Sequence, residues 1–146
     1  MEYDIREDDH PLHEWLTKLD RELLVFDEGA MRRKPRWSPA ARSRFVESIL
    51  LNVPVPPLYV FQQQDGTYVL LDGGQRMQAL RTFRQGRWKL RGLTVLGEFN
   101  GCTFAQLPPR QQAHLESCKV RCFVVKRPCT DEALDDLYAR LQGTQY

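Results

Sequence analysis

The sequence predicts an α+β fold, in which a small mixed sheet is flanked by helices in a single domain spanning residues 1–146. The chain has about the length of one domain with one hydrophobic core. Its hydrophobic fraction of 42% and its charged fraction of 27% are ordinary for a folded protein. Apolar residues recur at helical spacing in some segments and alternate in others, and the two kinds of segment are interleaved.

The first third of the chain predicts a helix, a strand and a second helix. Residues 10–20, "HPLHEWLTKLD", place Pro11 where a first helical turn accepts it. The run "ELLVF" at 22–26 is a strand candidate, and "MRRKPRW" at 31–37 is a polar, basic connection. Ser38 can cap the next helix, which the prolines of "VPVPP" end. The apolar stripe of this helix runs through Phe45, Val46, Ile49, Leu50 and Val53.

The middle of the chain predicts a hairpin followed by a helix. The runs "LYVFQ" (58–62) and "TYVLL" (67–71) flank "QQDG", a turn sequence typical of a β-hairpin. Asp72 ends the second strand and two glycines follow it. The next apolar residues lie on one face of a helix: Met77, Leu80 and Phe83.

The last third predicts turns, a helix, a strand and a final helix. Residues 87–104 predict short strands or turns. "LPPRQQAHLESC" (107–118) is typical of a helix begun by proline, and "KVRCFVVK" (119–126) alternates as a strand does. Thr130 can cap a last helix whose acidic first turns suit the positive end of the helix dipole.

Composition narrows the class of protein. A net charge of +2 excludes a strongly basic protein that coats nucleic acid. No segment approaches the roughly 18 apolar residues of a membrane helix. The acidic N-terminus "MEYDIREDDH" is not a secretory signal, so we expect no membrane partner and a cytoplasmic location. The 4 cysteines have irregular gaps, which favours free thiols over a zinc site.

The stretch "YVLLDGGQRMQAL" (68–80) is the main functional candidate. Glycines let the backbone approach a ligand closely, and the N–H groups at a helix start can hold a phosphate. Arg76 would then face an anion, Gln75 would bind phosphate or orient water, and Asp72 would hold a magnesium ion. The alternative is structural: Asp72 only caps the helix, and Arg76 pairs with Asp72 or with Glu47.

The run from residue 35 to residue 80 resembles the domain family marked by Asp-Gly-Gln-Gln-Arg, which forms the N-terminal part of GmrSD-type (type IV) restriction enzymes and related phage-defence proteins. The segments "PRW", "ESI", "PVPP" and "DGGQRMQAL" occur in family order, and "NGCTFAQLP" and "ARLQG" resemble its later segments. The same block is similar, more distantly, to the ParB and sulfiredoxin superfamily, whose ParB members bind a nucleoside triphosphate with the corresponding boxes. The resemblance implies a ParB/sulfiredoxin-like fold. The nucleotide-binding residues that it implies are Arg36, Arg44, Glu47, Ser48, Gly73, Gly74, Gln75 and Arg76.

The chain departs from this family at positions that bear on catalysis. Gly74 stands where the family has its first glutamine, so we expect anion binding to survive better than hydrolysis. Asp72 and Gln75 remain as the implied catalytic residues, with Asp72 also the implied Mg²⁺ ligand. Sulfiredoxin chemistry is excluded, because Gly74 occupies the position of its catalytic cysteine. No His-Asn-His nuclease pattern is present, so we expect that an effector region is lacking and that a separate nuclease does any cutting.

A second candidate is the basic cluster of Arg32, Arg33 and Lys34 beside Trp37. Cations with an adjacent aromatic ring can bind a DNA backbone and stack on a base. The alternative is a solvated loop with Trp37 packed in the core.

Two functions follow from these features. The first is a nucleotide-binding sensor or regulatory domain of a DNA-restricting phage-defence system, with slow Mg²⁺-dependent hydrolysis of a nucleoside triphosphate left open. The second is a ParB-like DNA-binding or protein-interaction module whose nucleotide pocket is vestigial. The expected partners are a nucleotide, DNA and an effector nuclease; the base and the oligomeric state stay open.

Overall fold

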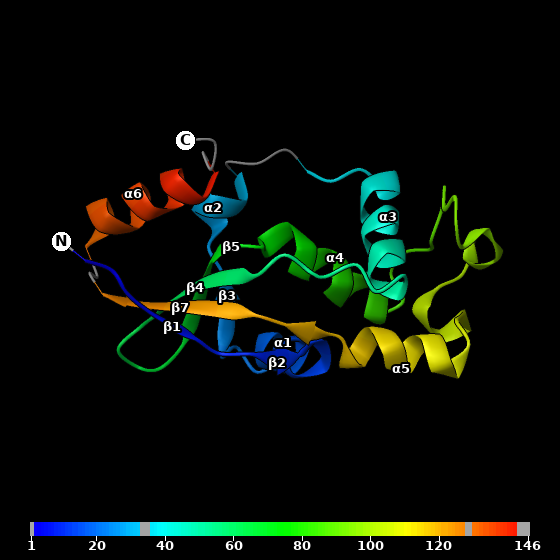
Figure 1. The fold of residues 1–146 in the computed structure, drawn as a ribbon, viewed down its shortest axis with the longest axis horizontal. Coiled ribbons are helices and arrows are strands. Elements are labelled where there is room, and N and C mark those ends of the chain that lie inside the picture. Colours follow the sequence, from blue (N-terminus) through cyan, green and yellow to red (C-terminus); the bar gives the residue numbers. More distant parts are fainter. Residues whose placement is uncertain (1, 33–35, 128–129, 143–146) are drawn as a thin grey trace.

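The computed structural model describes residues 2–32, 36–127 and 130–142, and its centre is a five-stranded mixed sheet (Figure 1). The strands of this sheet are β1 Asp4–Glu7, β3 Leu24–Phe26, β4 Leu58–Gln62, β5 Tyr68–Asp72 and β7 Cys122–Arg127. They lie in the order β1-β7-β4-β5-β3. The β1–β7 and β4–β5 pairs are antiparallel, while the β4–β7 and β3–β5 pairs are parallel. A separate two-stranded pair joins β2 (His10–Pro11) to β6 (Lys119–Val120).

Helices cover both faces of the sheet. In the described part of the chain they are α1 Leu12–Asp20, α2 Glu28–Arg32, α3 Pro39–Leu50, α4 Gly74–Arg84, α5 Pro109–Ser117 and α6 Asp131–Gln142. Two short 3₁₀ helices, η1 Gly97–Phe99 and η2 Phe104–Gln106, lie between α4 and α5 in the chain. Figure 1 shows α6 on one side of the strands and α1 on the other. The predicted α+β class is confirmed.

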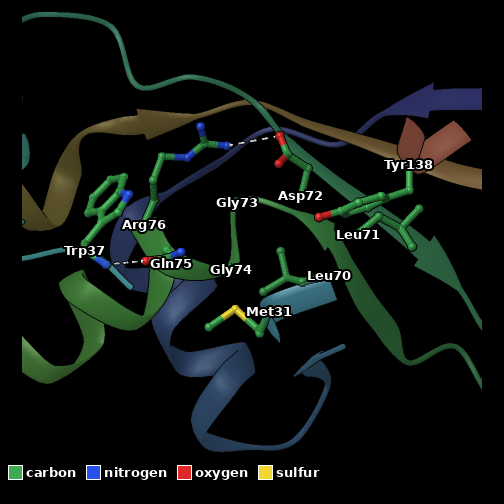
Figure 2. Close-up of a pocket in the computed structure, with 10 residues that line it drawn as sticks. All are labelled: Met31, Trp37, Leu70, Leu71, Asp72, Gly73, Gly74, Gln75, Arg76 and Tyr138. Atoms are coloured by element: carbon green, nitrogen blue, oxygen red, sulfur yellow. Dashed lines mark hydrogen bonds and ion pairs between the residues drawn. The ribbon is translucent and has the colours of Figure 1, made fainter. Parts of the chain in front are cut away.

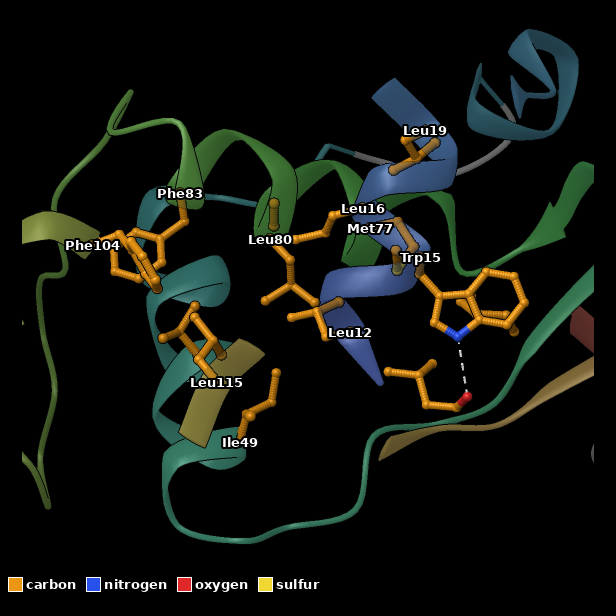
Figure 3. Packing of buried hydrophobic residues seen from close by; sticks show 14 of the residues in the cluster. Leu12, Trp15, Leu16, Leu19, Ile49, Met77, Leu80, Phe83, Phe104 and Leu115 are labelled. Atoms are coloured by element: carbon orange, nitrogen blue, oxygen red, sulfur yellow. Dashed lines mark hydrogen bonds between the residues drawn. The ribbon is translucent and has the colours of Figure 1, made fainter. Parts of the chain in front are cut away.

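Two hydrophobic clusters of unequal size hold these layers together. Neighbouring residues in a strand point to opposite faces of the sheet. Leu70 of β5 belongs to the large cluster, to which α1, α3, α4 and α5 contribute, whereas Leu71 packs with Leu137 of α6 in the small one. Trp15 is fully buried in the large cluster, where its indole N–H donates to the Val120 carbonyl at 3.2 Å (Figure 3). The fold therefore has one main core and a thinner layer under α6.

Several predicted elements are confirmed with their physical causes. The hairpin forms from β4 and β5, and the helix that begins with proline is α5. Ser38 Oγ accepts a hydrogen bond from Ala41 N at 3.1 Å and so caps α3. Thr130 Oγ1 accepts one from Ala133 N at 3.2 Å and caps α6.

Other predictions at the level of elements are wrong. Pro11 lies in β2 and precedes α1, and Val53 is 51% exposed because α3 ends at Leu50. For residues 87–104 the sequence left short strands or turns open, and the structure shows turns with η1 and the start of η2, without a strand. The sequence did not predict β1 or α2: β1 ("DIRE") has only one apolar residue, and α2 ("EGAMR") is five residues long and contains a glycine.

Candidate functional site

A tight turn joins β5 to α4, as the sequence predicted, and we call residues 72–76 the glycine turn. Asp72 ends β5, and Gly73 has a φ of 100°, a left-handed conformation that glycine adopts without strain. The helix begins at Gly74, so only Gly73 of the two glycines lies between the strand and the helix, and Met77 N donates to the Gly73 carbonyl at 3.0 Å. No side chain caps this helix at Gly73, and its first turn carries no acidic residue. Its first N–H groups therefore point out of the helix and form a potential anion site.

Arg76 lies in this first turn and is paired. Its guanidinium donates to the Pro57 carbonyl at 3.0 Å and lies 3.7 Å from Asp72 Oδ2 (Figure 2). The two side chains are only 15% and 16% exposed, and burial lowers the pKa of Arg76 while the charge of Asp72 opposes this shift. Arg76 Nε is buried without a hydrogen-bond partner. Asp72, not Glu47, is thus the ion-pair partner, and one donor of the guanidinium remains unused.

Gln75 connects the glycine turn to the segment before α3. Its side-chain carbonyl Oε1 accepts a hydrogen bond from the backbone N–H of Trp37 at 2.7 Å. The Trp37 ring is 36% exposed and packs edge-to-face on Phe45, with ring centroids 5.3 Å apart. The structure therefore brings Trp37, Gln75 and Arg76 to one place, and Trp37 is not fully buried in the core.

A small cavity of about 60 Å³ lies at the glycine turn, and we call it the glycine-turn cavity. Met31 of α2 lines it beside Gly74, where a Cβ atom would collide with the Met31 sulfur. Tyr138 of α6 lines it from the opposite side, with its hydroxyl end directed toward the turn in Figure 2. The sequence did not predict either residue for this site, because α2 was expected to be a connection and nothing local indicates that α6 lies beside β5.

A second, open cavity of about 850 Å³ adjoins the first and lies between α2, α3 and α4. The two cavities share Met31, Trp37 and Gln75 in their walls. Arg36 lines this larger cavity, so the structure places one predicted nucleotide-binding residue there and not at the glycine turn itself. We call it the arginine cavity, because Arg32, Arg36 and Arg42 all line it.

Three predicted site residues on α3 line neither cavity. Glu47 is 5% exposed, and its Oε2 accepts hydrogen bonds from Val95 N at 3.0 Å and Leu96 N at 2.9 Å. Arg44 is exposed on another face of the helix, where Ser48 Oγ donates to the Arg44 carbonyl at 3.0 Å. Arg44 and Glu47, which the resemblance implied for one nucleotide site, therefore differ in their surroundings: Arg44 is exposed and Glu47 is buried. Glu47 instead holds the backbone of residues 95 and 96.

The predicted DNA-binding cluster is described only in part. Arg32 is exposed and pairs with Glu28 at 3.2 Å, while Arg33 and Lys34 lie outside the described residues. Within the described ranges no group of three or more His, Cys, Asp or Glu residues could hold a metal ion. Asp72 would therefore need a ligand phosphate to complete a Mg²⁺ site. In the same ranges no helix is long and apolar enough to cross a membrane.

Two solved structures are similar to this chain in fold. The C-terminally truncated chromosome-partitioning protein ParB from Caulobacter crescentus, complexed with CTP-gamma-S, has a TM-score of 0.51 at 15% identity, covering 97% of this chain and 54% of that one. A Pnob8-like ParB-N domain has a TM-score of 0.52 at 15% identity, covering 99% of this chain and 40% of that one. The chain thus spans about half the length of these proteins. No protein family and no curated protein matches the sequence. The likeness confirms the ParB-like fold that the sequence predicted; the finer resemblance to the GmrSD-type family has no support here.

Proposed function

We propose that the chain is a ParB-like nucleotide-binding module that holds a phosphate group at the glycine turn. The observation that carries the proposal is the uncapped start of α4 at Gly73, with the buried Arg76 guanidinium in the same turn. Backbone N–H groups and an arginine are a common donor set for phosphate. In support, one of the two similar ParB structures is complexed with a CTP analogue.

The residues of the turn differ in what they contribute to binding and to hydrolysis. Arg76 supplies positive charge, whereas Asp72 is an anion and gains from a phosphate only through a bridging cation such as Mg²⁺. Gln75 positions Trp37, because its amide oxygen accepts a hydrogen bond from the Trp37 backbone N–H. Gly74 has no side chain to orient a water molecule. Binding with slow turnover is the outcome that this set favours.

The cellular setting extends this proposal. We infer a cytoplasmic sensor or regulatory domain of a phage-defence system, acting with DNA and an effector nuclease. The support is the order of the segments that resemble the GmrSD-type family. Self-association of the domain is part of the same proposal and is tested by its mass in solution with and without nucleotide.

A second function is favoured by the size of the glycine-turn cavity. Ligand pockets usually measure about 300–1,000 Å³, whereas this cavity measures about 60 Å³ and Met31 fills the space beside Gly74. A nucleoside triphosphate enters only if Met31 moves or if most of the ligand lies in the arginine cavity. If neither happens, the chain is a ParB-like DNA-binding or protein-interaction module with a vestigial pocket.

The test is calorimetric titration of the four ribonucleoside triphosphates, with and without Mg²⁺, into the protein and into Arg76→Ala. Losing a charge-assisted hydrogen bond should weaken affinity roughly tenfold to a hundredfold. Arg81→Ala is the matched control, because Arg81 lies on the same helix and pairs with Asp20 at 3.4 Å. Phosphate release from Asp72→Ala should fall more than its nucleotide affinity. Equal affinity of the protein and Arg76→Ala would contradict the phosphate role, and DNA binding without nucleotide binding would favour the second function.

A further inference from the structure

The arginine cavity carries a charge that its own walls do not balance. The described residues that line it include three arginines, Arg32, Arg36 and Arg42, and one carboxylate, Glu28. Glu28 pairs with Arg32. Arg36 and Arg42 form no ion pair with a described residue, so two positive charges remain uncompensated in an open cavity of about 850 Å³.

Arg42 is held in place by an aromatic ring, and no carboxylate among the described residues forms an ion pair with it. Its guanidinium lies over the Trp88 ring, 4.4 Å from the ring centroid, and its Nε is buried without a hydrogen-bond partner. Trp88 is itself fixed, since its indole N–H contacts the Ala79 carbonyl at 3.3 Å and Thr82 Oγ1 at 3.0 Å. Burial, and secondly the charge of Arg91, lower the pKa of Arg42. The Arg42 guanidinium is thus already positioned before a ligand binds, and its surroundings disfavour its positive charge. An anion that binds beside it would compensate this charge.

Neutral groups complete the cavity wall. Gln75 and Gln78 are three residues apart on α4 and share one face of the helix. Gln78 is exposed and offers an amide N–H₂ group as a donor. Trp37, which is 36% exposed, lies at the boundary with the glycine-turn cavity. The volume is within the range of about 300–1,000 Å³ that small-molecule sites occupy.

We propose that the arginine cavity binds the phosphate groups of a small phosphorylated ligand, with Arg36 and Arg42 as the cationic donors and Gln78 as a neutral donor. This site adjoins the glycine turn and shares wall residues with it, but phosphate binding by the arginines does not depend on nucleotide binding at the turn. A nucleoside triphosphate bound at the turn is one source of such phosphates, and a free polyphosphate is the other.

The test uses inorganic tripolyphosphate as the probe, titrated calorimetrically at low ionic strength. Arg36→Gln and Arg42→Gln should each weaken binding about tenfold or more, as expected for the loss of a charge-assisted hydrogen bond. Arg110→Gln is the control, because it removes the same charge from an exposed position on α5 that lines neither cavity, and it should change affinity less than about twofold. Thermal unfolding of each variant checks the fold. Arg42→Gln loses the contact with Trp88 and could unfold. Arg36 is exposed, so Arg36→Gln is expected to stay folded and can still test the proposal.

The outcomes separate this proposal from the nucleotide proposal. If all three variants lose the same amount of tripolyphosphate affinity, the attraction is non-specific and the proposal for the arginine cavity is wrong. The proposal is also wrong if the unaltered protein does not bind tripolyphosphate. Binding of tripolyphosphate without binding of any nucleotide would reject the glycine-turn proposal and leave the arginine cavity standing. A nucleotide whose affinity falls in both Arg42→Gln and Arg76→Ala spans both sites. If only Arg76→Ala weakens nucleotide binding, while Arg42→Gln weakens tripolyphosphate binding, the protein has two independent phosphate sites.

Discussion

At the scale of single residues, the Met31 side chain occupies the space where a side chain at residue 74 would lie. A Cβ atom at Gly74 would collide with the Met31 sulfur, so a side chain at this position requires the end of the flexible Met31 side chain to shift. Introducing glutamine, the residue that the resembling family carries there, would force Met31 aside. The two positions are therefore expected to be energetically coupled.

The first prediction concerns this pair. Gly74→Gln should destabilise the protein by about 1 kcal/mol, at the low end of the usual cost of overpacking, because the end of the Met31 side chain can shift. The double variant Gly74→Gln with Met31→Ala should recover most of this loss, because the space that Met31 leaves accepts the new side chain. Denaturant unfolding of the two single variants and the double variant gives the coupling. Additive effects would show that the two side chains do not compete for the same space.

A second prediction at the residue scale concerns Tyr68 at the other end of β5. Its hydroxyl donates to Asp8 Oδ2 at 2.9 Å. Burial, and then this hydrogen bond, raise the pKa of Tyr68 from 10.0 to about 12. The folded state thus favours the neutral phenol, so this contribution is complete below pH 10.0 and is lost as the pH rises toward about 12. Urea unfolding across this range should show a shallower decline in stability for Tyr68→Phe than for the unaltered protein, and equal slopes would contradict the assignment.

At the scale of elements, α3 holds the polypeptide that follows α4. Glu47 accepts the backbone N–H groups of Val95 and Leu96, and Ser43 Oγ accepts that of Arg91 at 3.1 Å. These contacts fix a segment that has no strand and only short 3₁₀ turns of its own. The buried polar face of α3 therefore has a structural role in the described chain.

The third prediction tests that role. Glu47→Ala leaves two backbone donors without their acceptor, and each such loss costs about 1–3 kcal/mol, so a total near 3 kcal/mol is expected. Arg44→Ala, on an exposed face of the same helix, should change stability by less than about 0.5 kcal/mol. Thermal unfolding compares the two variants. If Glu47→Ala keeps its stability but loses nucleotide affinity, the role that the sequence resemblance implied for Glu47 is restored.

The elements differ in how far the sequence could predict them. The hairpin and the capped helices α3 and α6 were predictable, because turn residues, caps and periodic apolar positions are local signals. The Asp72–Arg76 ion pair was one of two open alternatives, and i, i+4 spacing across the glycine turn makes the contact possible. The burial of Glu47 was not predictable, since its partners are backbone amides of a segment without periodicity. Met31 and Tyr138 depend on tertiary packing for the same reason.

At the scale of the whole molecule, the sheet separates a thick core from a thin one. The small cluster consists of Leu71, Val125 and Leu137 with a few half-buried neighbours, and it holds α6 on its face of the sheet. Tyr138, which lines the glycine-turn cavity, belongs to this weakly held helix. Access to the glycine turn is therefore coupled to the stability of the thin layer.

The fourth prediction follows from this asymmetry. Leu137→Ala should cost about 2–4 kcal/mol locally, as large-to-small changes of buried leucine do, and should raise amide hydrogen exchange in α6 while leaving α4 protected. Exchange followed by mass spectrometry on peptides from the two helices measures this. A parallel rise in α4 and α6 would mean that the two layers unfold as one cooperative unit.

The positions of the 3 tryptophans provide an optical reporter that needs no label. Trp15 and Trp88 are 0% and 6% exposed, whereas Trp37 is 36% exposed at the wall that both cavities share. A soluble quencher such as iodide should therefore reduce mainly the emission of Trp37. A ligand that occupies either cavity should shield that emission, so the intrinsic fluorescence of the protein can follow the filling of both sites in real time.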